Sequence, residues 1–292
     1  MKLKDLTYLV AVATHQHFGK AAEACFVSQP ALSMQIMKLE ESLGVQLLER
    51  SNKSVQLTDH GHAIVERARL ILSQVDDVKA IANAAKDPFS GEFRLGIFPT
   101  LAPYLLPHIM PTLKKHYPKM AFYLIEEKTP TLIEQLKAGE LHAAILATPV
   151  TEPSFTHHFL FEEPFLLATH KHHELAKLKS LKSQHLDEAN LLLLDEGHCL
   201  RDQALAVCHR MHATENQHFR ATSLETLRHM VGAGVGMTLM PKLACLPHKE
   251  LAYLPFANNA PHRRIALFSR KNSAKAVVLK DLAAKISAAM KH

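Results

Sequence analysis

Strand and helix patterns alternate along residues 92–290, and this alternation constrains the fold more than any other feature of the sequence. Short apolar runs with strand character are followed by segments whose apolar residues recur at helical spacing. Such alternation is typical of an α/β unit with a doubly wound sheet, and we expect two lobes with a cleft between them. The expected strands are 93–97, 122–125, 143–146, 166–169, 191–194, 237–240 and 265–268, and the expected helices are 101–116, 131–138, 223–233 and 273–290.

Glycine motifs that hold nucleotide phosphates are missing from this α/β segment. The sequence contains neither a G-x-G-x-x-G motif nor a Walker motif. The glycines of residues 232–236 follow a helix, so they are typical of a turn that ends a helix. We therefore expect no nucleotide, other cofactor or metal in this protein.

The first 60 residues predict a helix-turn-helix followed by a small β-wing. Two short helical segments, 3–14 and 18–24, precede a third in which Ser28 is a suitable N-cap and Pro30 lies in the first turn. Leu32, Ile36 and Leu39 would face the core of this unit. The opposite face would then present Ser33, Gln35 and Lys38 to the major groove of DNA.

The predicted wing comprises residues 46–50, a polar turn at 51–54 and residues 55–58. Arg50 and Lys53 at its tip would reach phosphates. Residues 1–60 carry as many acidic as basic side chains, so the placement of the charges and not their sum favours DNA here. A three-helix packing unit with no DNA role is the structural alternative.

Residues 62–85 have the pattern of one long helix. Ile64, Ala68, Ile71, Val75, Val78 and Ala82 follow each other at steps of four and three, which is typical of a narrow coiled-coil seam. Charged residues flank this seam, so we favour pairing with a second copy over packing within the same chain. The sequence 87–91 then breaks the helix, and we expect domains at 1–60, 61–87 and 88–292.

Two cysteines, Cys199 and Cys208, lie nine positions apart in a segment that has the pattern of a helix start. On one continuous helix their Cα atoms would be separated by about 13 Å, whereas a disulfide needs Cα atoms about 4.4–6.8 Å apart. The two thiols could bond only if this helix unfolded, which is the physical basis of a redox switch. Two unrelated buried cysteines are the alternative.

Composition indicates a globular protein with an anionic partner. The chain has 292 residues and a formal net charge of +6. No apolar run approaches the length of a membrane span. Four cysteines do not make a disulfide framework, and we expect a reducing, cytoplasmic setting in which a disulfide would be a transient sensor.

The N-terminal motif resembles the winged helix-turn-helix of LysR-type transcription regulators. The similarity is carried by residues 21–24 (AAEA), 28–36 (SQPALSMQI), 39–44 (LEESLG) and 48–50 (LER). Cys25 falls where a small core residue is expected. The resemblance implies a linker helix and a two-lobed, periplasmic-binding-protein-like regulatory domain, and it implies double-stranded promoter DNA and RNA polymerase as partners. The DNA-binding residues would be Ser28, Gln29, Pro30, Ser33, Gln35, Lys38, Arg50 and Lys53.

The regulatory half resembles the peroxide-sensing, OxyR-type branch of that family. Residues 100–107 (TLAPYLLP), residues 197–205 (GHCLRDQAL) with Cys208, and residues 218–228 (HFRATSLETLR) carry the similarity. The resemblance implies that Cys199 attacks hydrogen peroxide and that Cys208 closes a disulfide. It also implies a homodimer that pairs into a tetramer. The residues around the peroxide would be Thr100, Thr129, His198, Asp202, His218 and Arg264, with Arg263 adjoining the last.

The residue types agree with this chemistry, because the thiolate is the reactive form of cysteine. A helix N-terminus, His198 and Arg201 are all able to lower the pKa of Cys199. Three alternatives stay open: the protein could be a regulator that binds a metabolite in the cleft, it could be a thiol peroxidase, or it could bind a soft metal ion. The metal site would use Cys208, His209, Met211 and His212.

Overall fold

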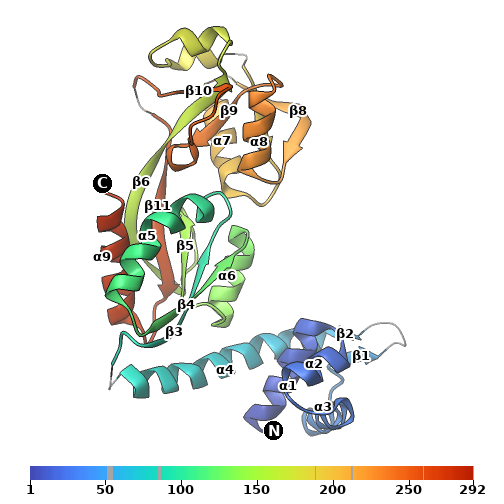
Figure 1. Ribbon diagram of the computed structural model, residues 1–292. Helices are drawn as coiled ribbons and strands as arrows, with labels where there is room; N and C mark the ends of the chain where they lie inside the picture. Colours follow the sequence, from blue (N-terminus) through green and yellow to red (C-terminus); the bar gives the residue numbers. More distant parts are fainter. Residues whose placement is uncertain (51–54, 85–86, 188, 212, 259, 292) are drawn as a thin grey trace. The chain divides into compact units, whose positions relative to one another are not determined.

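A computed structural model describes residues 1–50, 55–84, 87–187, 189–211, 213–258 and 260–291 (Figure 1). Its contacts divide the chain into two compact units. The first unit comprises Met1–Lys86 with Lys137–Glu140, and the second comprises Asp87–Leu136 with Leu141–His292. None of the described helices is long and apolar enough to cross a membrane.

The first unit is a winged helix-turn-helix. Helix α3 begins after Ser28, whose Oγ accepts a hydrogen bond from the backbone N–H of Ala31 at 3.4 Å, and ends at Gly44 in a left-handed conformation with φ of 70°. Leu32, Ile36 and Leu39 lie in its core as predicted. The elements are α1 (Leu3–His15), α2 (Phe18–Ala24), α3 (Gln29–Leu43), β1 (Leu48–Arg50), β2 (Val55–Leu57) and α4 (Asp59–Ala84).

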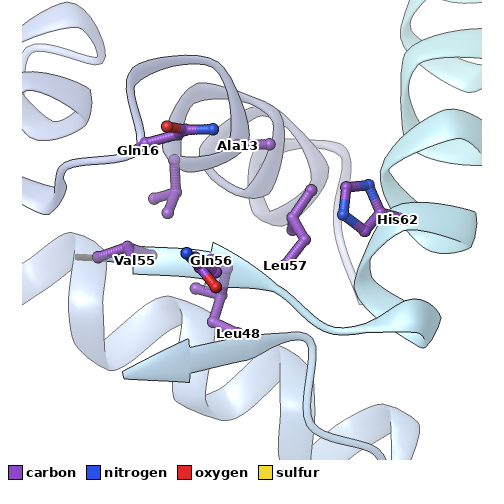
Figure 2. Close-up of a pocket in the computed structure, with 8 residues that line it drawn as sticks. Ala13, Gln16, Leu48, Val55, Gln56, Leu57 and His62 are labelled. Atoms are coloured by element: carbon purple, nitrogen blue, oxygen red, sulfur yellow. The ribbon is translucent and has the colours of Figure 1, made fainter. Parts of the chain in front are cut away.

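The wing is fastened to the helices by side chains at its base. Glu40 of α3 accepts hydrogen bonds from the backbone N–H groups of Leu47 and Leu48 at 2.9 and 3.2 Å. Between α1, the wing and the start of α4 lies a pocket of about 250 Å³. Figure 2 shows its lining, which includes apolar side chains of the wing and the polar Gln16, Gln56 and His62.

The start of α4 packs directly on the backbone of the wing. At Gly61 a Cβ atom would lie 2.1 Å from the carbonyl oxygen of Leu47. We expect Gly61→Ala to lower the free energy of opening of this unit by about 1–3 kcal/mol, because the backbone must shift to relieve the overlap. Amide exchange in α3 measures this opening. Ser42→Ala on the exposed side of α3 is the control and should leave the exchange rates unchanged, whereas unchanged rates in Gly61→Ala would contradict the packing.

The second unit is built on one mixed sheet with the order β10-β6-β11-β5-β3-β4, and β9 also pairs with β6. Strand β3 is parallel to β4 and β5, while β11 runs antiparallel to β5 and β6. The strands are β3 (Gly91–Ile97), β4 (Met120–Glu126), β5 (Ala143–Ala147), β6 (Phe155–His170), β7 (Asn190–Leu194), β8 (Thr214–Ala221), β9 (Thr238–Pro241), β10 (Leu251–Leu254) and β11 (His262–Arg270).

This unit has two lobes, and strand β6 runs from one into the other, as Figure 1 shows. Its first part pairs with β11 in one lobe, and its last residues pair with β9 and β10 in the other. A separate two-stranded sheet of β7 and β8 belongs to the second lobe. The helices are α5 (Ala102–His116), α6 (Thr129–Ala138), α7 (Cys199–Arg210), α8 (Leu224–Gly232) and α9 (Ala276–Ala289), with 3-10 turns η1 (Glu174–Lys177), η2 (Ser183–Leu186) and η3 (Lys242–Ala244).

The α/β class and the two lobes are as predicted, but the extent of β6 is not. The sequence pattern predicted a strand only at residues 166–169, whereas β6 begins at Phe155. Strands β8 and β10 were also missed. Residues 155–164 (FTHHFLFEEP) show no period-two alternation, because pairs of histidines and acids interrupt the apolar residues, Phe159 is exposed and Glu163 is buried.

Candidate functional site

Cys199 is the first residue of α7, and the loop that follows β7 carries it to the boundary between the lobes. Gly197 adopts a positive φ of 82° in this loop, a conformation that favours glycine. From the other lobe, Thr100 lies after β3 and Thr129 is the first residue of α6. These residues meet around a tight crevice that, in this structure, has no room for a water-sized sphere, and it is lined by Phe98, Pro99, Thr100, Lys128, Thr129, Gly197, His198 and Cys199.

A buried guanidinium, that of Arg263 on β11, lies behind this space. Arg263 is 1% exposed, and its Nε donates to Glu163 Oε2 at 2.7 Å. Its other nitrogens donate to the hydroxyl and the carbonyl oxygen of Thr100, both at 3.1 Å. Because Thr100 Oγ1 accepts this bond, its own proton remains available to a further acceptor.

The prediction for Arg264 is corrected by this geometry. Neighbouring residues of a strand point to opposite faces, so the side chains of Arg263 and Arg264 diverge. Arg264 has a side chain that is 58% exposed, and it pairs with Glu162 at 3.4 Å and lies over the ring of Phe159. The arginine at the thiol is therefore Arg263.

Opposing influences act on the pKa of the Cys199 thiol. Burial raises the pKa and is the largest influence, and the Arg263 guanidinium and the Thr129 hydroxyl lower it. Asp202, which is exposed, raises it further. The net pKa of Cys199 is above that of an ordinary thiol. The expected help from His198 and Arg201 is not what the structure shows.

His198 is buried, and burial together with the nearby Lys128 lowers its pKa. The imidazole is therefore neutral at pH 7 and brings no positive charge to the thiol. Arg201 is also turned away from Cys199. Its guanidinium makes two hydrogen bonds to Glu215 of β8, at 2.6 and 2.9 Å, and a third to the carbonyl oxygen of Leu194.

The Thr129 hydroxyl is a buried polar group that faces the thiol. Its Oγ1 atom is shielded from solvent and acts on the Cys199 sulfur as a hydrogen-bond donor, which lowers the pKa of that thiol; no other partner of this atom is found among the residues that the structure describes. A buried hydroxyl whose hydrogen-bonding capacity is only partly used indicates a place where a small polar molecule would bind. The side chain of His218, predicted to belong here, lies outside the described part of the chain.

Cys208 lies at the other end of α7, in the apolar core of the second lobe with Leu191, Leu193 and Val207. Burial raises its pKa. All four cysteines of the chain are free thiols. Cys25 packs in the helix-turn-helix core as predicted, and Cys245 is a half-buried thiol whose pKa burial raises to about 12. Cys199 thus differs from Cys25 and Cys208 by its polar neighbours, whereas Cys245 also lies near charged side chains, those of Arg228 and Glu163.

The predicted DNA-binding residues are mostly on the exposed side of α3. Ser28, Gln29, Pro30 and Lys38 are exposed and Ser33 is partly exposed. Gln35 is partly exposed and its Nε2 donates to Asp5 Oδ1 of α1 at 3.0 Å, so its contact with DNA stays a prediction. Lys53 lies outside the described residues, and so does the side chain of Arg50.

No group of three metal-ligating side chains is found within the described ranges. The soft-metal hypothesis at Cys208 therefore gains no support from the described geometry, since Cys208 faces an apolar core. One of its proposed ligands, His212, is not described.

The fold and site together define a DNA-binding regulator, with a winged helix-turn-helix joined to a two-lobed domain that holds a thiol at the lobe boundary. Residues 3–62 match the bacterial regulatory helix-turn-helix protein family model of the lysR family, and residues 86–290 match the LysR substrate binding domain. The chain therefore belongs to the LysR family of transcription regulators.

Similar proteins within this family sharpen the comparison. The hydrogen peroxide-inducible genes activator of Escherichia coli O157:H7 is 46% identical over 276 residues, which cover 94% of this chain and 90% of that protein. Full-length OxyR C199D from Pseudomonas aeruginosa is 37% identical with a TM-score of 0.81, covering 98% and 94% of the two chains. The oxidised form of OxyR is 43% identical with a TM-score of 0.65, covering 70% of this chain and 98% of that chain.

The opposite surroundings of Arg263 and Arg264 provide a test of the site. Removal of the buried cation should raise the pKa of Cys199 and slow its alkylation at pH 7.5. Because Arg263 alone cannot be removed without leaving Glu163 buried and unpaired, the test variant is Arg263→Gln with Glu163→Gln. Alkylation by iodoacetamide followed against pH gives the pKa directly.

Arg264→Gln with Glu162→Gln is the matched control and should alkylate as the wild type does. In the wild type the rate should keep rising above about pH 8.5, where an ordinary thiol is half ionised. A wild-type profile that levels off below that pH, or equal profiles for the two double variants, would contradict the assignment of Arg263.

Proposed function

We propose that this chain is a DNA-binding transcription regulator that responds to hydrogen peroxide through Cys199 and Cys208. The observation that carries the proposal is the arrangement at the start of α7. There Cys199 faces the buried hydroxyl of Thr129 and the charge of Arg263, and Cys208 lies at the far end of the same helix. The names of the similar proteins support the same function.

The reaction balances with peroxide as the only oxidant. The Cys199 thiolate attacks one peroxide oxygen, an S–O bond forms, the O–O bond breaks, and hydroxide takes up a proton to leave as water. The product is a sulfenic acid. The Cys208 thiol then attacks that sulfur, an S–S bond forms, and a second water leaves. Two thiols and one peroxide thus give one disulfide and two waters.

The polar groups of the site suit this sequence of steps. The Arg263 charge stabilises the thiolate, and the hydroxyl protons of Thr100 and Thr129 are available to the two peroxide oxygens. Neutral His198 is able to accept or donate one hydrogen bond at the edge of the same space. Contacts of Asp202 and His218 with the peroxide or with the residues that bind it stay predictions.

The size of the enclosed space favours peroxide over a metabolite. Pockets for small organic ligands are about 300–1,000 Å³, whereas the crevice beside Cys199 has no room for a water-sized sphere, so only a very small molecule would enter it with a minor shift of side chains. A metabolite-binding regulator of the same family is therefore the weaker proposal. A thiol peroxidase is weaker still, because it would have no use for the DNA-binding unit. We propose a sensor and not an enzyme: its thiols would react once with peroxide and would then have to be reduced again in the cytoplasm before they could react a second time.

Disulfide formation requires that α7 unfold. The two Cα atoms are separated by about 13 Å along the helix, which is more than twice the usual span of a disulfide. Cys208 must leave its apolar core, and the segment that carries Arg201 must move relative to Glu215. This refolding is the step by which oxidation would alter the regulatory domain and so change DNA binding and contact with RNA polymerase.

Substitution of each thiol should separate the two chemical steps. Cys199→Ser should abolish reaction with stoichiometric peroxide, because a serine hydroxyl is neither ionised nor oxidised at neutral pH. Cys208→Ser should stop at the sulfenic acid, which a dimedone-type probe traps, and the wild type should trap poorly. Peptide mass mapping is the measurement, with Cys25→Ser and Cys245→Ser as controls that keep the Cys199–Cys208 link. A disulfide that includes Cys25 or Cys245 would refute the proposal.

We also propose that α4 pairs with a second copy through its exposed seam. Ile71 and Val78 are exposed large apolar residues on this helix, although Ala68 of the predicted seam is buried within its own unit. Because two copies would bring these residues together, lysines there would meet like charges in the interface. The pair would supply the two DNA-reading helices of a palindromic site.

Ile71→Lys with Val78→Lys should give a smaller species in sedimentation velocity. The control is Glu66→Lys, which also changes the charge by two and lies about 140° away around the helix. It should sediment as the wild type does. A doubly substituted seam with wild-type sedimentation would exclude α4 as the interface.

A further inference from the structure

Met34 lies at the centre of the exposed face of α3. It is two residues from both Leu32 and Ile36, which places it about 160° around the helix from each of these core residues. Its side chain is 52% exposed. Pro30 and Lys38 are one turn away on either side of it, so the three side chains form one stripe along the outer face.

The same stripe is the part of α3 best suited to a DNA groove. The first eleven residues of α3, 29–39, contain no acidic side chain, and the N-terminus of this helix carries a partial positive charge. A recognition helix contacts base edges with its N-terminal residues. Beyond this stretch Glu40 and Glu41 begin an acidic region, so phosphates are repelled from the C-terminal end.

Gln35, the polar residue expected to contact bases from this helix, forms a hydrogen bond within the protein instead. The Gln35 amide donates to Asp5, whose pKa burial raises but whose hydrogen bonds from Gln35 and Lys2 lower it on balance. The bond holds α1 against α3, and it orients Gln35 away from the centre of the exposed stripe. Base recognition at that centre therefore falls to the methionine.

We infer that Met34 reads a thymine by apolar contact with its 5-methyl group in the major groove. A thioether has no hydrogen-bond donor and is a weak acceptor, so it cannot use the polar pattern of base edges. The thymine methyl is the apolar group that the major groove offers, and a flexible, polarisable side chain is suited to it. The inference rests on the proposed DNA binding by α3.

Met37 provides a matched control on the same helix. It is 42% exposed, but it lines a hollow with Glu40, Glu41 and Glu49 beside the wing. Phosphates would be repelled from this acidic surface, so Met37 should not enter the groove. The two methionines thus share chemistry and helix but differ in the surface they face.

The experiment first selects a binding site for the full-length protein from a pool of random duplexes. Each thymine of that site is then replaced by deoxyuridine, which removes only the methyl group, and the Kd is measured by fluorescence anisotropy at one fixed salt concentration. For the wild type, deoxyuridine at one position in each half-site should weaken binding about fourfold per methyl group.

Met34→Ala should bind the thymine and deoxyuridine duplexes equally well, Met34→Leu should keep part of the difference, and Met37→Ala should keep all of it. If Met34→Ala retains the wild-type sensitivity at every thymine, Met34 is not the reader. If no thymine methyl affects the wild type, the inference also fails while DNA recognition stands. A pool that yields no enriched sequence would overturn the proposed DNA reading itself.

Discussion

The interaction on which the site depends is the buried ion pair between Arg263 and Glu163. A buried guanidinium is stable only if its hydrogen bonds are satisfied, and here Glu163 and Thr100 satisfy them from two different segments. Glu163 also accepts a hydrogen bond from the backbone of Leu243 at 2.9 Å. The pair therefore ties β6, β11 and the turn after β3 together and sets a positive charge beside Cys199. The same ion pair therefore fixes the position of these segments and places the positive charge that acts on the thiol.

The reduced form of α7 is held by two features that oxidation would have to overcome. One is the burial of Cys208 among leucines, and the other is the bidentate bond between Arg201 and Glu215, which a second cation, Arg220, supports at 3.4 Å. The pKa of Glu215 is lowered, with the hydrogen bond from Arg201 as the largest cause. In the proposed switch the covalent bond would offset the loss of these contacts, so one helix would compete with one disulfide.

The sequence was sufficient for the elements whose character is local. The alternation of strands and helices, the capped helix α3 and the two-lobed class follow from periodicity and from residues such as Ser28. The sequence pattern could not show the length of β6, because polar residues interrupt its apolar run and polarity does not follow its two faces: Phe159 is exposed and Glu163 is buried. It also could not decide between Arg263 and Arg264, since that choice depends on which face of β11 meets the core. The hydrogen bond of Gln35 was not foreseen because its partner, Asp5, is thirty positions away, and Met34 was overlooked because polarity alone was taken as the sign of a DNA contact.

The raised pKa of Cys199 and the small space around it have one consequence together. A largely protonated thiol reacts slowly with oxidants in general, because only the thiolate is a strong nucleophile. Speed toward a particular oxidant must then come from groups that act on that oxidant in the transition state. The hydroxyls of Thr100 and Thr129 are placed for such a role only with a molecule small enough to fit beside them. Selectivity for peroxide would therefore arise from the dimensions of the site and its hydroxyl donors, and not from an unusually acidic thiol.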